Sequence, residues 1–337
     1  MKTKYICLPI IALLLFSCSP DRPEIFKNQN AGGALGTSYN LTYLSDKQLD
    51  FQKEIDSVFD AVNHSLSTYL PNSDISKINR GDSTLVVDAM FRDVFELSKE
   101  IYDKTGGYFD PTVGVLVDAW GFGPGEQMEL DSVRIDSLLD FVGFDKVSLT
   151  DEDTIKKSHP GIHLDFNAIA KGYTIDRLAR LMDKKNIQDY LLEVGGEVVA
   201  KGLNTIKEKQ WVVGIDDPQM GEIRKLKILI TLKDRALASS GNYRKFRMDS
   251  ITGNKYVHTI DPKTGFTKNA NTLGVTTLAN TCAKADAYAT ALMAMDLDPA
   301  IKLLTSQRDL EAYIVYLDEK GEPQEFMTEG FKRVITE

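Results

Sequence analysis

Two oxygen-bearing side chains stand one helical turn apart in an alanine-rich stretch near the C-terminus. Residues 281–292 favour a helix because alanine is the strongest helix former. Asp286 and Thr290 are four residues apart, so a helix would project both from one face. A carboxylate and a hydroxyl are hard oxygen donors, which suit Mg²⁺ better than zinc or copper. The same pair also fits a structural role, with a carboxylate near the helix N-terminus and a hydroxyl bonded to its own helix.

A second polar segment, residues 161–173, predicts a strand, a turn and then the start of a helix. Free backbone N–H groups at a helix start favour an anion, and Lys171 adds a positive charge in the first turns. Asp165 has two possible roles. It either accepts a hydrogen bond from a ligand or caps the helix.

His258 stands just before the turn at residues 261–265, Asp-Pro-Lys-Thr-Gly. A histidine near a phosphorylated ligand can act as a general base, although a single histidine often has only a structural role. Two glycine-containing turns, at Gly195–Gly196 and at residues 239–241, allow close approach of a flat or phosphorylated group. The chain contains neither the dinucleotide motif G-x-G-x-x-G nor a Walker A loop, which argues against a Rossmann fold and a P-loop enzyme.

The N-terminus has the pattern of an export signal. Lys2 and Lys4 precede an apolar run over residues 6–16, which is shorter than the roughly 20 residues needed to span a bilayer. Cys18 directly follows a small residue, as in a bacterial lipobox. We therefore expect a signal peptide over 1–17, lipidation of Cys18 and an extended tether over 18–33. The alternative is an ordinary signal peptide with a coincidental cysteine.

Charge and cysteine content indicate which partners and which stabilising interactions to expect. The net charge is −9 and no cluster of Lys and Arg offsets it, so nucleic acid is not an expected partner. Once Cys7 leaves with the signal and Cys18 carries lipid, only Cys282 remains. No intramolecular disulfide is then possible, and stability must come from a packed core.

The apolar spacing predicts helices over 45–66, 91–105 and 173–185, besides the alanine-rich one. Predicted strands cover 39–43, 161–166, 190–194, 211–215, 225–231 and 273–278. These elements do not alternate strictly as βαβ units. The expectation is a single mixed α+β domain over 34–337.

The order of the motifs resembles that of the FAD:protein FMN transferase (ApbE) family. The matching segments are 36–39, 67–69, 110–114, 165–173, 195–196, 239–241, 258–265 and 286–290. The resemblance covers residues 35–295. The sequence departs from the family pattern at Leu35, where Met is usual, and at Glu193 and Ser239, where Asn and Thr are more common.

The resemblance implies a flavin cleft between two lobes and a role for each motif. The implied FAD contacts are Leu35, Tyr69, Tyr108, Phe109, Asp110, Asp165, Lys171, Gly195, Gly196 and His258. The implied Mg²⁺ ligands are the backbone carbonyl of Ala168 and the side chains of Asp286 and Thr290. His258 and Asp286 are the implied catalytic residues, with His258 deprotonating an acceptor threonine.

The implied activity is Mg²⁺-dependent transfer of FMN from FAD to a threonine hydroxyl of a target protein, with release of AMP. The implied acceptors are subunits of membrane redox complexes of the Na⁺-pumping NADH:quinone oxidoreductase or Rnf type. Together with lipidated Cys18, they predict a protein anchored at the periplasmic side of a membrane. The alternatives are an FAD pyrophosphatase giving FMN and AMP, and a flavin-binding lipoprotein without enzymatic activity.

Overall fold

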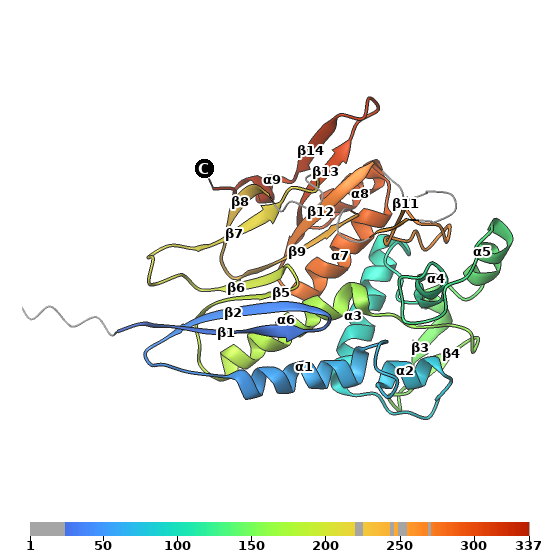
Figure 1. Ribbon diagram of the computed structural model, residues 1–337, viewed down its shortest axis with the longest axis horizontal. Helices are drawn as coiled ribbons and strands as arrows, with labels where there is room; N and C mark the ends of the chain where they lie inside the picture. The colour runs from blue at the N-terminus through green and yellow to red at the C-terminus, as the bar shows by residue number, and fades with distance from the viewer. Residues whose placement is uncertain (1–23, 220–224, 243–245, 249–254, 269–270, 337) are drawn as a thin grey trace, which may run out of the picture.

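The computed structural model describes residues 24–219, 225–242, 246–248, 255–268 and 271–336. Its largest feature is a sheet of eight strands in which every neighbouring pair is antiparallel (Figure 1). In spatial order the strands are β1 (Phe26–Ala34), β2 (Thr37–Ser45), β5 (Asp189–Val194), β6 (Glu197–Lys201), β9 (Arg235–Gly241), β12 (Thr272–Ala279), β13 (Glu311–Leu317) and β14 (Pro323–Met327).

Four long helices cover one face of this sheet or pack on those that do. They are α1 (Gln52–Leu66), α3 (Ala89–Thr105), α6 (Asn167–Lys184) and α7 (Cys282–Ala294). Helices α1 and α6 pack on β2 and β5 through an apolar cluster that includes Leu41, Phe59 and Leu178. Helix α7 lies between α6 and strands β9 and β12. The opposite face is covered by the ribbon of β7 (Trp211–Asp216) and β8 (Leu226–Leu232) and by α9 (Glu329–Lys332).

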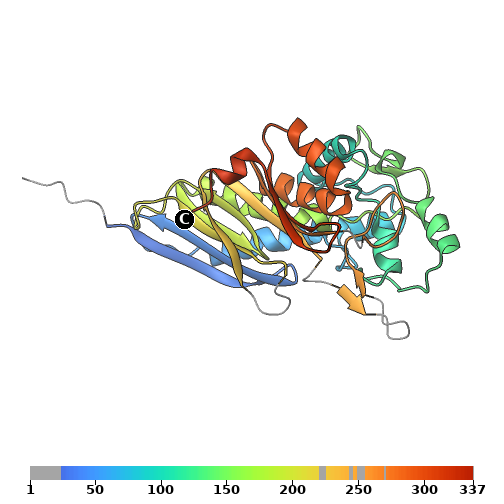
Figure 2. The same ribbon diagram turned by 90° about the horizontal axis from the view of Figure 1, so that it is seen from above.

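The remaining elements lie mainly beside the sheet. Figure 2 shows the sheet at one end of the molecule and a smaller lobe at the other. That lobe contains α2 (Asp74–Asn79), α4 (Gly114–Ala119), α5 (Ser132–Leu139), the 3₁₀ turn η1 (Phe144–Lys146), β3 (Val147–Leu149) and β4 (Ile155–Lys157). A short ribbon of β10 (Phe246–Met248) and β11 (Lys255–Val257) and helix α8 (Leu297–Ser306) complete the described fold.

The mixed α+β class is confirmed, and most predicted elements are present. Capping residues set the ends of α3. The Asp88 carboxylate accepts a hydrogen bond from the backbone N–H of Phe91 at 2.8 Å, and Gly106 ends the helix at φ 60°. The helix predicted over 45–66 begins only at Gln52. Ser45 is the last residue of β2, and residues 46–51 connect that strand to the helix.

The strand predicted over 161–166 is wrong. This segment makes only an isolated bridge between His163 and Val113. Its backbone bonds to other segments instead: Asn79, the last residue of α2, exchanges two side-chain hydrogen bonds with the backbone of Leu164, at 2.8 and 2.9 Å. The N–H of Asp165 donates to the carbonyl of Pro111, in a loop, at 2.7 Å. The apolar alternation therefore reflects burial between the end of α2 and a loop rather than membership of a sheet.

The predicted tether over 18–33 also needs correction. Residues 26–34 form β1, which pairs with β2 along its whole length. Asn28 and Asn30 are buried there, and the hydroxyl of Tyr43 donates to Asn30 Oδ1 at 2.8 Å. The folded domain thus begins no later than Phe26. The predicted signal peptide and Cys18 lie outside the described residues. Among those described, no helix combines the length and apolar character needed to cross a bilayer.

Candidate active site

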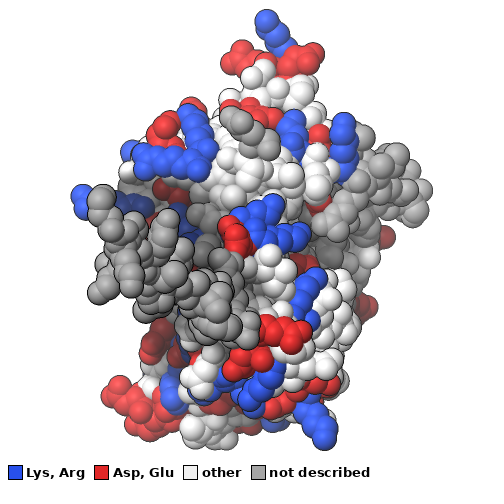
Figure 3. All heavy atoms as spheres, turned by 90° about the vertical axis from the view of Figure 1, so that its left-hand side faces the viewer, with Lys and Arg blue, Asp and Glu red and all other residues white. Residues whose placement is uncertain are grey.

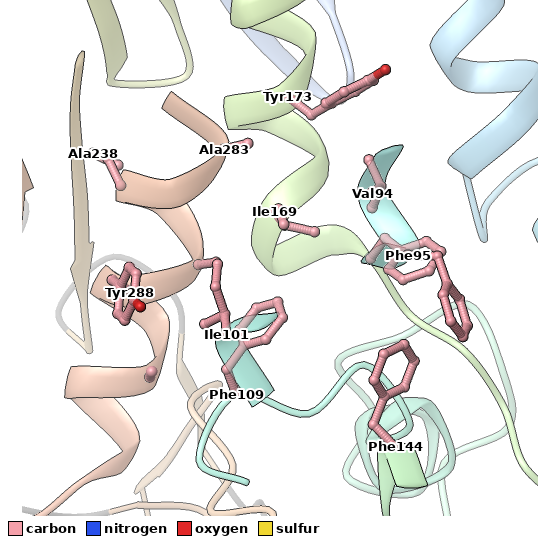
Figure 4. Packing of buried hydrophobic residues seen from close by; sticks show 14 of the residues in the cluster. Val94, Phe95, Ile101, Phe109, Phe144, Ile169, Tyr173, Ala238, Ala283 and Tyr288 are labelled. Atoms are coloured by element: carbon pink, nitrogen blue, oxygen red, sulfur yellow. The ribbon is translucent and has the colours of Figure 1, made fainter. Parts of the chain in front are cut away.

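Helices α6 and α7 approach each other closely at a glycine. A Cβ placed on Gly172 would lie 2.4 Å from the carbonyl oxygen of Cys282 and 2.8 Å from the nitrogen of Ala283. No side chain fits there, so backbone meets backbone. Figure 4 shows Ile169 and Tyr173 on α6 near Ala283 of α7. The alanine-rich composition of α7 permits this contact, as the sequence suggested.

Contacts between the two helices recur about every four residues, and residue numbers rise along α7 as they fall along α6. The Asp176 carboxylate accepts hydrogen bonds from the backbone N–H groups of Cys282, at 2.8 Å, and Ala283, at 2.9 Å. One turn earlier on α6, the N–H of Gly172 donates to Asp286 Oδ2 at 3.1 Å. The helices are therefore antiparallel here. If this register continued for one more turn of 3.6 residues on each helix, Ala168 would lie opposite Thr290.

Asp286 is 6 % exposed, and it lies in a buried group of charges. The ammonium of Lys171 pairs with Glu197 Oε1, and Glu197 is 2 % exposed. Burial raises the pKa of Asp286, and Lys171 opposes that effect. Burial alone would lower the pKa of Lys171, but the carboxylates of Asp286 and Glu197 raise it above its ordinary value. The site thus combines one lysine with two buried carboxylates.

Two tight hairpin turns lie side by side at the end of β5. Leu35 and Gly36 connect β1 to β2 with φ values of 52° and 70°, and Gly195 and Gly196 connect β5 to β6 at 64° and 102°. The N–H of Gly195 donates to the carbonyl of Ser38 at 2.9 Å. A leucine in the left-handed region costs about 1 kcal/mol or more. The structure thus places the start of β2, which follows the Leu35 turn, beside Gly195, and a Cβ on Gly195 would lie 3.4 Å from Glu197 Oε2.

Tyr69 and Asp165 lie in a second group, near the start of α6. Tyr69 is 58 % exposed, and partial burial together with the carboxylates of Asp165 and Asp118 raises its pKa. The Asn167 side chain donates to the hydroxyl of Thr68 at 3.3 Å, which joins the 67–69 motif to α6. Asp165 is buried and accepts from the N–H of Asn167 at 2.6 Å. It is not the N-cap residue, a position that Phe166 occupies without a side-chain bond.

The 108–110 motif faces a different segment. Phe109 is 3 % exposed and its side chain belongs to the main core, as Figure 4 shows, so only its backbone is open to a ligand. Lys263 Nζ lies 4.1 Å from the ring centre of Tyr108. A hollow of about 260 Å³ opens at this junction. Its lining residues are Tyr102, Gly106, Gly107, Asp110, Val142, Gly143, Asp145, Pro262 and Lys263.

His258 directly follows β11 and is partly buried. The segment that carries it is fixed at two points. The hydroxyl of Thr259 donates to Asn242 Oδ1 at 2.7 Å, and the indole N–H of Trp120 donates to the carbonyl of Gly265 at 2.8 Å. The first bond ties His258 to the polar turn that follows β9, and the second ties the 261–265 turn to α4.

Two charged residues of this group were not predicted from the sequence. The charged side chains of Asp176 and Glu197 are central to the site, yet neither was predicted. Glu197 adjoins the glycine pair, a signal that was visible in the sequence. Across the described residues, no group of three His, Cys, Asp or Glu side chains could hold a metal. The expected Mg²⁺ set needs no such group, because it has one carboxylate, one hydroxyl and one backbone carbonyl.

Comparison with known proteins gives a consistent picture. The ApbE family model matches residues 35–314. The chain is 31 % identical over 324 residues to the FAD:protein FMN transferase of Haemophilus influenzae, covering 92 % of each chain. It is 30 % identical over 335 residues to the Vibrio cholerae protein of the same name, covering 96 % of each.

Solved structures agree with the sequence relatives. The flavin transferase ApbE from Vibrio cholerae superposes with a TM-score of 0.81 at 28 % identity, covering 92 % of this chain and all of that one. The ApbE protein from Thermotoga maritima gives 0.80 at 27 % identity, covering 93 % of this chain and all of that one. The chain belongs to the ApbE family.

Proposed function

We propose that this protein is an FAD:protein FMN transferase that uses Mg²⁺ to move FMN from FAD to a threonine hydroxyl of an acceptor protein. The names of its relatives support the flavin transfer. The observation that carries the rest is the antiparallel register of α6 and α7, in which the backbone N–H of Gly172 donates to Asp286. Extended by one turn, that register supports Ala168 and Thr290 as the other two ligands.

The residues at this junction suit Mg²⁺. Asp286 is buried at a position where burial disfavours its ionised form, and a bound cation would stabilise that form. Ala168, Asp286 and Thr290 would supply three oxygens, leaving places for water and phosphate oxygens in an octahedral shell. When bound, the metal would polarise the FAD diphosphate and offset charge on the departing AMP.

The protein's own groups would bind and orient the dinucleotide. Lys171, held by Glu197, supplies a fixed positive charge beside the expected diphosphate position. The turns at Leu35 and Gly195 let a flat group approach the backbone, and exposed Tyr69 offers a face for stacking. The 260 Å³ hollow beside Asp110 is large enough for one end of the dinucleotide.

His258 would take the proton of the acceptor hydroxyl. The threonine oxygen then bonds to the FMN phosphorus, the phosphoanhydride bond breaks, and its electron pair leaves with AMP. The products are a phosphoester-linked flavin, AMP and one proton. Hydrolysis would follow the same course with water as acceptor, giving free FMN.

The location belongs to the same proposal. Lys2, Lys4 and the apolar run before Cys18 support export and lipid anchoring at the periplasmic side of a membrane. Redox-complex subunits of the Na⁺-pumping NADH:quinone oxidoreductase or Rnf type would meet the enzyme there.

The decisive experiment mixes the protein with FAD, MgCl₂ and a purified acceptor subunit, and follows AMP and flavinylated peptide by mass spectrometry. The wild-type protein should yield both products. Chelation of Mg²⁺ or the substitution Asp286→Asn should remove both, while Asp103→Asn, at an exposed carboxylate of α3, should leave them unchanged. AMP with free FMN and no modified peptide would identify a pyrophosphatase. Flavin binding without AMP would contradict enzymatic activity altogether.

A further inference from the structure

Packing alone does not explain why a charged residue occupies the position of Glu197. It is the first residue of β6, directly after the glycine turn, and is 2 % exposed. Its Oε1 accepts from the ammonium of Lys171. Its Oε2 is buried and has no hydrogen-bond partner within the described part of the chain. A buried carboxylate oxygen without a partner lowers the stability of the folded state.

Lys171 has two carboxylates within electrostatic reach, and its bond goes to one of them. Both Asp286 and Glu197 raise the pKa of Lys171, but the hydrogen bond of its ammonium is with Glu197. Asp286 instead receives the backbone N–H of Gly172. Glu197 Oε2 has no donor among the described residues, so the bond to Lys171 is the hydrogen bond that the Glu197 carboxylate makes there. The charge of Glu197 also acts on Asp286, whose pKa it raises.

This division of partners matters for a cation. A lysine ammonium that paired directly with Asp286 would cancel the only carboxylate among the three expected Mg²⁺ ligands. A cation at Asp286 would then have to displace the lysine or bind without that charge.

We propose that Glu197 is a positioning residue that holds Lys171 away from Asp286 and thereby sets the Mg²⁺ affinity of the site. The proposal rests on the proposed function, because it assumes Mg²⁺ at Asp286. Glu197 acts through Lys171 and touches neither metal nor substrate. The orphaned oxygen is the structural cost of burying this carboxylate beside the lysine.

The test is a double-mutant cycle read by Mg²⁺ binding rather than by turnover. Calorimetry with MgCl₂ alone measures affinity for the wild type, Glu197→Gln, Lys171→Met and the double variant. Glu197→Gln should weaken Mg²⁺ binding about tenfold, because the ammonium turns to Asp286. In the Lys171→Met background, Glu197→Gln should change affinity less than about twofold, because no lysine remains to be held.

The cycle separates this role from a simple field effect. If Glu197 acts only by its own charge, Glu197→Gln weakens Mg²⁺ binding equally in both backgrounds, and the proposal is overturned. Unchanged affinity in Glu197→Gln overturns it as well. Glu54→Gln is the matched control, since Glu54 pairs with Lys185 at 2.5 Å on the exposed surface of α1 and α6. It should leave Mg²⁺ affinity unchanged.

Two further arms keep the outcome interpretable. If Glu197→Gln alone does not melt cooperatively, a loss of Mg²⁺ affinity between Lys171→Met and the double variant still overturns the proposal, because only a direct field effect predicts it, and Glu197→Ala then replaces Glu197→Gln as the single variant. Glu197→Asp keeps the charge and should restore Mg²⁺ affinity to within about threefold of wild type. A wild-type protein that binds no Mg²⁺ would contradict the proposed function itself, whereas an additive cycle contradicts only the role of Glu197.

Discussion

At the scale of single residues, the site keeps carboxylates in places where burial makes them unfavourable. Asp110 is the clearest case, because burial raises its pKa from 3.8 to about 6. Between pH 3.8 and about pH 6 the folded state binds more protons than the unfolded state. The free energy of unfolding therefore falls as the pH rises through that range. A carboxylate that lowers stability at neutral pH is a candidate for function rather than for folding.

Asp110→Asn should therefore stabilise the protein above pH 6. The backbone N–H and the hydroxyl of Thr112 both donate to Asp110 Oδ1, and asparagine retains that oxygen. We expect a gain in unfolding free energy of about 1–3 kcal/mol at pH 8 and almost none at pH 4, from urea titrations without ligand. Asp103→Asn, at an exposed position, serves as control. A gain that is the same at both pH values would show that burial of charge is not the cause.

His258→Gln tests the second residue-scale role. If His258 is the general base, the variant should still bind FAD, while single-turnover flavin transfer slows by about 10²–10⁴-fold. Fluorescence titration of FAD and quenched-flow analysis of flavinylated acceptor separate binding from chemistry. His64→Gln, on the exposed surface of α1, is the matched control. Wild-type transfer rates in His258→Gln would place the base elsewhere.

Residue identity alone predicted part of this site. Asp286 and Thr290 were predicted because their spacing on one helix places both side chains on a common face, and Lys171 was predicted from its charge near the start of another helix. The structure brings Lys171 and Asp286 within electrostatic reach of each other. Asp176 and Glu197 were missed because their importance comes from partners more than twenty residues away, across a helix pair and a sheet edge. No local pattern encodes such a contact.

At the scale of elements, the pairing of α6 with α7 depends on one missing methyl group. Gly172→Ala would by itself favour a helix by about 1 kcal/mol. Its Cβ would instead meet the backbone of Cys282, which cannot rotate away. We expect a net loss of about 1–3 kcal/mol in unfolding free energy and weaker Mg²⁺ binding, because Asp286 is pushed from α6.

The control for this prediction is Gly33→Ala in β1, where the nearest atom to a new Cβ is the carbonyl oxygen of Thr37 at 3.7 Å. Stability there should change by less than about 0.5 kcal/mol. Thermal and urea unfolding, with and without MgCl₂, provide the measurement. A stabilised Gly172→Ala protein would mean that the helices tolerate a wider separation than their backbone contact indicates.

Periodicity predicted α1, α3 and α6, whose buried residues recur on one face, and it failed where burial came from contacts outside a sheet. Helix α7 is buried on almost every side and was predicted from its alanine content instead. Residues 161–166 alternate like a strand, but their partners are the side chain of Asn79 and the loop at Pro111. The first strand was missed for the opposite reason. The sequence around Asn28 and Asn30 is polar and rich in glycine. Both side-chain amides are nevertheless buried, and each donates a hydrogen bond to another side chain.

At the scale of the whole molecule, charge and architecture agree with a small-molecule enzyme that meets a protein partner. Figure 3 shows acidic and basic side chains interspersed over one face, and the net charge of the whole chain is −9. The predicted flavin contacts come from both the sheet end and the smaller lobe. The relative position of these two parts was beyond sequence reasoning, because it depends on packing between distant segments.

The final prediction concerns where the folded molecule begins. A protein that starts at residue 24 keeps β1 and should melt like the full chain and retain flavin transfer in detergent-free buffer, since it lacks the predicted lipid site.

A protein that starts at residue 35 loses the edge strand, and with it the bond from the hydroxyl of Tyr43 to Asn30 and the bond from Leu49 N–H to Asn28. Tyr43 is fully buried, and its hydroxyl would keep only the longer bond to the carbonyl of Leu49 at 3.2 Å, while β2 would become an open edge. We expect a lower melting temperature and concentration-dependent aggregation, measured by calorimetry and light scattering. Equal stability of the two truncated proteins would restore the tether boundary at residue 33 and leave β1 as an accessory strand.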